Sequence, residues 1–258
     1  MLTYRTTNMI AGGLLSGLLL LQIAGYRVHW SWFAGLIVAY IAIAAWGSCR
    51  IAAGFYLPVT CAVTTDEKVV ALSFDDGPHP QHTPQLLDLL REQQVPATFF
   101  CIGRNIRGNE ELLRRIIAEG HLIGNHTWSH HFWFDMFTSG RMLADMQQMD
   151  AEVKEVSGKK PLLFRPPYGV TNPALRKAIQ EGGYFPLGWS IRSLDTVIKD
   201  KAQLLARVVK QLHPGAVILL HDTSEATIQI LPELIAYIRQ EGYTIKHIDD
   251  LLKIPAYA

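Results

Sequence analysis

The stretch that decides the fold runs Val69-Val70-Ala71-Leu72-Ser73-Phe74-Asp75-Asp76-Gly77-Pro78. Its apolar beginning and its polar Gly-Pro end predict a buried strand that delivers its last residues to a surface. Neighbouring side chains of an extended chain point in opposite directions, so we expect Asp75 and Asp76 to have different tasks. One carboxylate would bind a metal ion while the other handles a proton.

Short apolar runs alternate with amphipathic stretches through the rest of the chain. Strands are predicted at 69–74, 97–102, 121–125, 161–164, 184–189, 216–221 and 243–247, and helices at 83–93, 109–119, 139–157, 172–182, 200–212 and 227–241. This alternation predicts an α/β fold with a parallel sheet and helical crossovers.

Polar residues follow successive predicted strands, and their placement favours a barrel over an open sheet. They are Asp75 and Asp76 after the first strand, His126 after the third, Arg165 after the fourth, Asp195 after the fifth and His221 at the end of the sixth. In a β/α barrel the C-terminal ends of all strands meet at one mouth, where active sites are built. The barrel therefore brings these residues together.

The N-terminal region differs in composition from the rest. Residues 6–26 and 28–49 contain no Asp, Glu, Lys or Arg, and each stretch approaches the ~20 apolar residues that cross a bilayer. We predict a two-span hairpin in preference to a cleaved signal peptide or buried core helices. The predicted organisation is thus a membrane-anchor region at 1–50, a connector at 51–67 and a catalytic domain at 68–258.

Charge and cysteine content argue against a nucleic-acid-binding protein and against a protein held by disulfides or a cysteine zinc site. The formal net charge is +1 and the chain has no basic run, which argues against a nucleic-acid partner. Cys49, Cys61 and Cys101 match neither a zinc pattern nor a disulfide framework. The sequence indicates no protein partner.

Three further motifs have both a functional and a structural interpretation. His126 and His130, at positions i and i+4, would face the same way on a helical turn, and two imidazoles with one carboxylate form a common zinc set. The segment Arg165-Pro166-Pro167-Tyr168-Gly169 offers a guanidinium fork for a carboxylate and a rigid turn, or only a structural loop. Taken singly, His221 is more typical of a hydrogen-bonded histidine in the core. Asp195 alone is typical of a solvated acidic residue in a turn.

Together these residues resemble the polysaccharide deacetylases of carbohydrate esterase family 4, the NodB-homology domain. The family motifs occur in order at Ser73 to Pro78, His126 to His130, Arg165 to Tyr168, Arg192 to Thr196 and Leu219 to His221. The fourth motif departs from the family pattern, because Arg192 stands where an Asp is common and Thr196 where a Trp is common. Loss of that Trp removes an apolar wall of the acetyl pocket.

The resemblance implies a distorted (β/α)7 barrel, related to the TIM barrel, and a set of roles. Asp76, His126 and His130 would bind a divalent metal, taken as zinc. Asp75 would be the general base, held by Arg165, and His221 the general acid, oriented by Asp195. A backbone amide near Tyr168 would stabilise the oxyanion, and Pro167, Tyr168 and Leu219 would contact the substrate.

The implied activity is removal of N-acetyl groups from N-acetylglucosamine-type residues of a glycan such as a chitin oligomer or peptidoglycan, with release of acetate. An O-acetyl esterase and a deformylase or deacetylase of a lipid-linked sugar remain as alternatives on the same machinery. A catalytically silent, membrane-anchored carbohydrate-binding barrel is the alternative of another class, and the filled catalytic positions argue against it. The resemblance also implies a bacterial-type cell membrane with the catalytic domain outside the cytoplasm.

Overall fold

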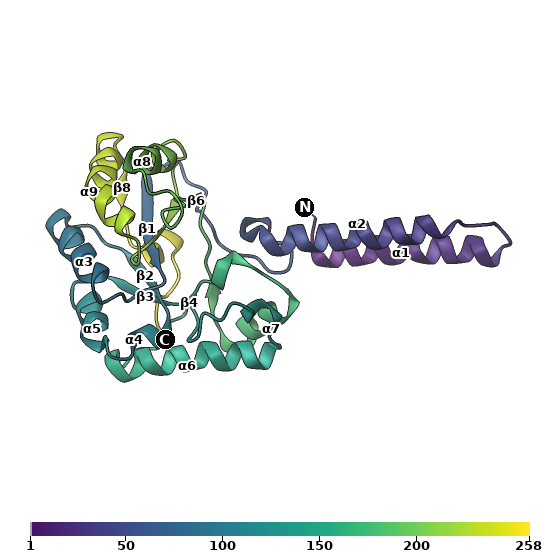
Figure 1. Cartoon of the computed structure of the whole chain (residues 1–258), viewed down its shortest axis with the longest axis horizontal. Coiled ribbons are helices and arrows are strands. Elements are labelled where there is room, and N and C mark those ends of the chain that lie inside the picture. The colour runs from purple at the N-terminus through teal and green to yellow at the C-terminus, as the bar shows by residue number, and fades with distance from the viewer. Residues whose placement is uncertain (1) are drawn as a thin grey trace.

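The computed structural model describes residues 2–258, which form an α/β domain with a long helical hairpin projecting from it (Figure 1). The hairpin consists of α1 (Tyr4–Ile23) and α2 (Trp30–Cys49). Within it, the Tyr40 hydroxyl donates a 2.8 Å hydrogen bond to Asn8 Oδ1. Both helices are long and apolar enough to cross a membrane, and only 6% of each is buried.

The domain is built on a curled parallel sheet that forms a half-barrel. Its strands are β1 (Val69–Asp75), β2 (Thr98–Cys101), β3 (Leu122–Asn125), β4 (Leu163–Phe164), β5 (Phe185–Pro186), β6 (Ile191–Arg192), β7 (Ala216–His221) and β8 (Thr244–Ile245). The order is β5-β4-β3-β2-β1-β7-β6, with β8 paired to the start of β1. The predicted fold class is therefore confirmed, and β6 is an additional two-residue strand.

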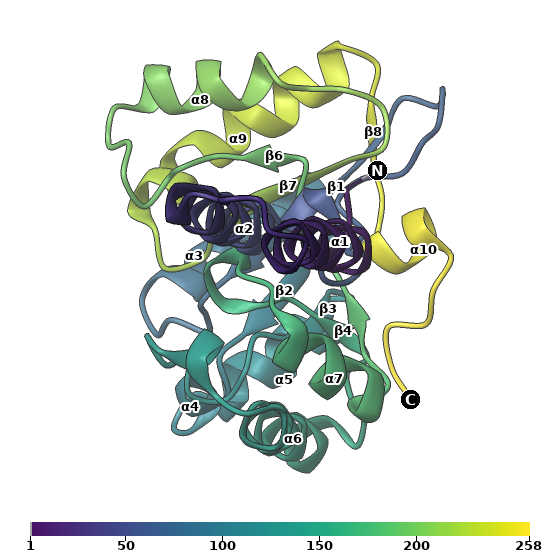
Figure 2. The ribbon, with the colours of Figure 1, turned by 90° about the vertical axis from the view of Figure 1, so that its right-hand side faces the viewer.

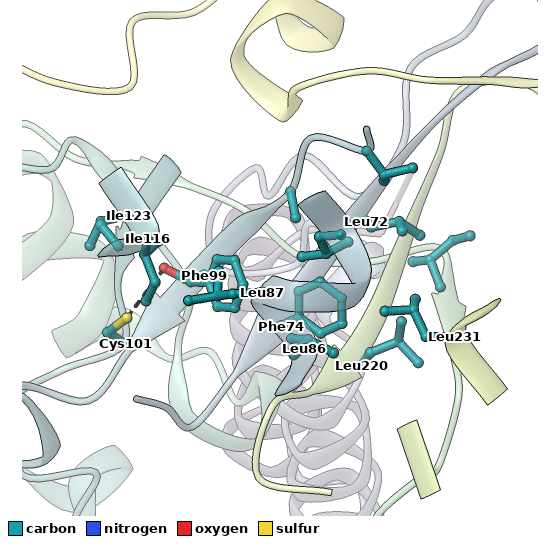
Figure 3. Packing of buried hydrophobic residues seen from close by; sticks show 14 of the residues in the cluster. Leu72, Phe74, Leu86, Leu87, Phe99, Cys101, Ile116, Ile123, Leu220 and Leu231 are labelled. Atoms are coloured by element: carbon teal, nitrogen blue, oxygen red, sulfur yellow. Dashed lines mark hydrogen bonds between the residues drawn. The ribbon is translucent and has the colours of Figure 1, made fainter. Parts of the chain in front are cut away.

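Strand β1 is an interior strand of the sheet, and every one of its seven residues is buried. It pairs with β2 on one side and β7 on the other, and Phe74 stands in register with both Phe99 and Leu220. The rings of Phe74 and Phe99 stack at 5.2 Å, as Figure 3 shows together with leucines of two covering helices. A strand covered on both faces has a continuous apolar sequence, which explains the run that begins at Val69.

Helices connect the strands and cover the sheet. They are α3 (His82–Gln93), α4 (Gly103–Ile106), α5 (Glu110–Ala118), α6 (Ser139–Ser157), α7 (Pro173–Gly182), α8 (Lys201–Val209), α9 (Glu225–Gln240) and α10 (Ile248–Leu252). The side chains of Thr138, Asn172 and Asp200 cap α6, α7 and α8. The six predicted helices are present, while α4 and α10 are too short to show a helical period.

Residues 51–67, predicted as a connector, pack closely against the domain. Phe55, Tyr56 and Leu57 are buried in a cluster with Met142 and Met146 of α6. Further along, this segment forms isolated bridges to the strand region at Leu187 and Ala216. The connector therefore forms part of the wall of the domain.

The hairpin is joined to the domain at the end of α2. The Thr171 amide donates to Ser48 O at 3.1 Å, and the Phe55 ring packs on Gly47, where a Cβ would lie 2.2 Å from that ring. Viewed along the hairpin, both helices project in front of the sheet (Figure 2). The hairpin base thus contacts the loop that leads into α7.

Candidate active site

The two aspartates at the end of β1 face the same cavity. Asp75 is the last residue of the strand, and Asp76 adopts a left-handed conformation with φ 79°. The chain therefore leaves extended geometry between them, and the expectation of opposite directions was wrong. What separates their roles is their surroundings.

The cavity has a volume of about 170 Å³ and opens among the C-terminal ends of the strands. Its walls are formed by Asp75, Asp76, His126, His130, Pro166, Tyr168, Gly169, Trp189, Arg192, Thr196, Leu219 and His221. Arg165 and Asp195 are buried behind these residues. Pro166 lines the cavity, whereas Pro167, expected to contact substrate, is buried and absent from the walls.

Asp76, His126 and His130 form a cluster that fits a cation. Asp76 Oδ1 lies 3.5 Å from Nε2 of each histidine, and the three potential ligand atoms lie within 4.8 Å of one another. That oxygen is buried and has no hydrogen-bond partner among residues 2–258. Two imidazoles and one carboxylate are a common zinc donor set that leaves a position open.

The segment from His126 to His130 is a loop, so the predicted helical turn was wrong. Thr127 and His130 have positive φ values of 66° and 41°. Side-chain acceptors hold the loop: Asn125 Oδ1 accepts from the Thr127 amide, and Asp145 Oδ1 accepts from the amides of Trp128 and Ser129. Sequence reasoning missed Asn125 and Asp145, because their partners are set only by the folded loop.

The hydrogen bonds and pKa values of His126 and His130 decide how each ring can bind a metal ion. His126 Nδ1 lies 2.7 Å from the Arg165 carbonyl oxygen. Because a carbonyl only accepts, Nδ1 carries a proton, and Nε2 is the nitrogen left to bind a cation. Burial alone would lower the pKa of His126, but Asp75 and Asp76 raise it, so a bound cation would take the place of a proton at Nε2. Burial, helped by the neighbouring His126, lowers the pKa of His130 to about 4, so this ring is neutral at physiological pH.

Arg165 is fully buried and holds Asp75 by one nitrogen. Its Nη1 donates to Asp75 Oδ1 at 2.6 Å and to Ser73 Oγ at 2.9 Å, while Nη2 donates to Gly188 O at 2.8 Å. The guanidinium also lies 4.0 Å from the Phe100 ring centroid. The bidentate contact suggested by the sequence is therefore not formed, and Asp75 Oδ2 remains free of the arginine.

The partly exposed His221 and the buried Asp195 form a second pair. His221 Nδ1 donates to Asp195 Oδ1 at 2.7 Å, and its backbone amide donates to Oδ2 at the same distance. The hydroxyl of Thr227 donates to Asp195 Oδ2 as well. Burial alone would lower the pKa of His221, but the hydrogen bond and charge of Asp195 raise it to about 9. The His221 side chain, which lines the cavity, is therefore protonated at neutral pH.

Asp222, which sequence reasoning did not single out, supports the turn after Asp76. It is fully buried, accepts a 2.6 Å hydrogen bond from Thr83 Oγ1, and packs on Gly77, where a Cβ would lie 1.8 Å from its Oδ2. Burial raises its pKa to about 7. Only glycine fits beside this carboxyl, which explains why glycine stands at position 77 of the motif Ser73 to Pro78.

The divergent fourth motif forms one side of the cavity. Arg192 and Thr196 both line it, and the Arg192 guanidinium lies 5.7 Å from the Trp189 ring. Trp189 packs against Gly169, where a Cβ would lie 2.6 Å from the indole. Trp189 and Leu219 line the same cavity and give it an apolar surface beside Arg192 and Thr196.

The chain is similar to known polysaccharide deacetylases. Residues 62–186 match the family described as polysaccharide deacetylase. A peptidoglycan-N-acetylglucosamine deacetylase of Bacillus cereus is 38% identical over 204 residues, which cover 76% of this chain and 93% of that protein. This chain belongs to the polysaccharide deacetylase family.

Two other similar proteins agree with this assignment. The peptidoglycan-N-acetylmuramic acid deacetylase PdaA of Bacillus subtilis is 35% identical, and the match covers 73% of each chain. The crystal structure of the Bc1960 peptidoglycan N-acetylglucosamine deacetylase superposes with a TM-score of 0.73 at 26% identity, covering 78% of this chain and 95% of that one. The family match at residues 62–186 includes Asp75, Asp76, His126, His130 and Arg165, whereas Asp195 and His221 lie beyond its end.

Proposed function

We propose that this polysaccharide deacetylase is a zinc-dependent hydrolase that removes N-acetyl groups from N-acetylglucosamine-type residues of peptidoglycan. The observation that carries the proposal is the convergence of three groups on one cavity. These are the candidate metal cluster, the Asp75–Arg165 pair and the His221–Asp195 pair. The curated peptidoglycan deacetylases that the chain resembles support this choice of glycan.

The metal cluster supplies the electrophilic side of the reaction. Asp76, His126 and His130 would hold the ion, and the unpartnered Asp76 Oδ1 is the group that most needs one. Burial alone would raise the pKa of Asp76, but His126 and the other histidines around it hold that pKa well below its usual range. A zinc ion bound here would polarise the acetamide carbonyl and make a nearby water easier to deprotonate.

Asp75 is the proposed general base. Arg165 fixes its Oδ1, which leaves Oδ2 to accept the proton of the attacking water as the water oxygen bonds to the acetamide carbon. The tetrahedral oxyanion would receive a hydrogen bond from the backbone amide of Tyr168. Tyr168 lies on the cavity wall in a left-handed conformation, with its ring 4.9 Å from that of His130.

His221 is the proposed general acid. An amine leaves poorly unless it is protonated, so cleavage of the carbon–nitrogen bond needs a donor on the leaving-group side. His221 Nε2 donates its proton to the departing nitrogen, while Nδ1 stays hydrogen-bonded to Asp195. Acetate and a free amino sugar result, and the cycle closes when Asp75 loses its proton and His221 regains one.

Acetate release by the full chain in detergent tests this function. With an N-acetylglucosamine oligomer or purified peptidoglycan we expect steady release that a chelator abolishes and added zinc restores, because Asp76 is the least satisfied polar group of the cavity. An O-acetylated oligomer is the matched control for substrate. Faster release from that ester than from the amide, or release unaffected by the chelator, would contradict the proposal.

We also propose that α1 and α2 anchor the enzyme in the cell membrane with the catalytic domain on the extracytoplasmic face, where peptidoglycan lies. Their length, apolar composition and low burial support the anchor. Protease added to intact cells is expected to digest the domain. A domain that stays intact until the cells are lysed would place it in the cytoplasm.

A further inference from the structure

An exposed apolar rim lies beside the mouth of the cavity, in and around the short helical turn η2 (Phe134–Met136). Phe132, Trp133 and Met136, which we call the apolar rim, are 66%, 59% and 74% exposed. Phe134 of the same turn is buried, and Phe137 packs beside it. The turn therefore buries one apolar face in the domain and presents a second one outward.

The buried face of this turn is continuous with the base of the hairpin. Phe134 and Phe137 share one hydrophobic cluster with Phe55 and Tyr56 and with Tyr4 and Ile43 of the hairpin. The backbone is tied in as well, since Asn172 Nδ2 donates to Asp135 O at 2.6 Å and the adjacent Thr171 donates to Ser48 O. The rim is thus attached to the place where the hairpin leaves the domain.

We propose that the apolar rim lies in the interface of the same bilayer that α1 and α2 cross, so that the domain rests on the membrane. The proposal rests on the membrane anchor proposed above. Aromatic side chains favour the headgroup level of a bilayer, and a short apolar surface there binds in the plane of the membrane. Exposed cationic groups accompany it: the Arg141 guanidinium stacks 3.6 Å from the Phe137 ring centroid, and Arg50 follows α2.

The arrangement places the candidate metal cluster close to the membrane surface. Tyr168 contacts His130, and only three residue steps, at most about 11 Å, separate Tyr168 from Thr171 at the hairpin junction. A glycan would therefore be deacetylated while it lies against the membrane.

Sugar stacking is the competing explanation of the rim. Trp133 and Met136 are not among the residues that line the cavity, whereas the Phe132 ring lies 6.2 Å from that of Tyr168, which does line it. None of the three rim residues lines the cavity, as a sugar subsite next to the reacting centre would. Its continuity with the hairpin favours the membrane.

Depth-dependent quenching tests the proposal with the full chain in lipid nanodiscs. An environment-sensitive fluorophore is attached at Met136→Cys, at Leu20→Cys in the hairpin, or at Glu111→Cys on α5, which lies on the far side of the domain (Figure 1). The exposed Cys49 and the partly exposed Cys61 are changed to serine in all variants, whereas Cys101 is buried. Lipids with a nitroxide near the headgroup are the quencher.

We expect quenching at positions 136 and 20 and none at 111. Quenching at 20 without quenching at 136 overturns the membrane-facing rim and leaves the anchor standing. An absence of quenching at all three positions overturns both. None of these outcomes depends on deacetylase activity, so failure of the proposed reaction is detected separately.

A second variant separates the membrane from sugar stacking. Trp133→Ser/Met136→Ser is expected to keep KM for a soluble N-acetylglucosamine oligomer within about two-fold of the unaltered chain, because neither side chain lines the cavity. Quenching at position 136 is measured separately, on the labelled Met136→Cys variant in nanodiscs. A rise in KM of about ten-fold would make the rim a glycan-binding surface and overturn the proposal.

Discussion

Replacing Asp75 with asparagine is expected to lower kcat for acetate release by about a thousand-fold, the scale of a lost general base. Asparagine keeps the size of the side chain and can still accept the Arg165 hydrogen bond, but it cannot take a proton from water. Because Asp75 is not one of the three clustered ligands, zinc content should stay at one ion for each chain. Acetate release and metal analysis on the same sample check both parts.

The substitution also removes the charge that faces a fully buried guanidinium. Breaking a buried ion pair at one partner costs about 3–5 kcal/mol, so thermal unfolding of Asp75→Asn is expected at a lower temperature. Asp75→Asn/Arg165→Met, which removes both charges, provides a second inactive variant if the single one does not fold. Asp88→Asn, at a half-exposed carboxylate paired with Arg91 and Arg115, is the matched control and should keep full activity. An Asp75→Asn enzyme retaining a tenth of its turnover would exclude Asp75 as the base.

Replacing Asp195 with asparagine is expected to lower kcat by about a hundred-fold or more, although Asp195 does not line the cavity. Asp195 acts through His221, because both its carboxylate oxygens accept hydrogen bonds from that residue. The substitution removes the charge that keeps the imidazole protonated. His221→Ala should lose at least as much activity, and the double variant should be no worse than His221→Ala, since the pair acts as a unit.

The pH profile distinguishes this role from a merely structural one. His221 donates only while protonated, so the activity of the unaltered enzyme should fall as pH rises through about 9, the raised pKa of His221. Burial lowers that pKa, and without Asp195 only the weaker effects of Asp75 and Asp76 oppose it, so the fall should begin at a lower pH. Kinetics of acetate release from pH 5 to 10 would show the shift. An unchanged alkaline limb in Asp195→Asn would contradict the assignment of His221 as the acid.

Strand periodicity and the ordered motifs were enough to predict the parallel α/β fold and most of the residues that line the cavity. A parallel sheet sends all its strand ends to one edge, so residues that follow strands meet there whatever the details of the loops. For this reason Asp75, Asp76, His126 and His221 were expected together and lie together. The two-residue strand β6 and the short helices α4 and α10 escaped prediction because they are shorter than any periodic signal.

Which chemical role each of those residues takes depends on the tertiary structure alone. Asp75 becomes a candidate base because Arg165, distant by 90 positions in sequence, occupies one of its oxygens, and Asp76 turns toward the histidines because its backbone is left-handed. The same holds for the loop from His126 to His130, for the partnership of His221 with Asp195, and for the contact of the hairpin with Thr171. The sequence determined which chemical groups reach the mouth, because strand pattern is local. Their distances, protonation and orientation depend on residues far apart in the chain, and only packing brings those residues into contact.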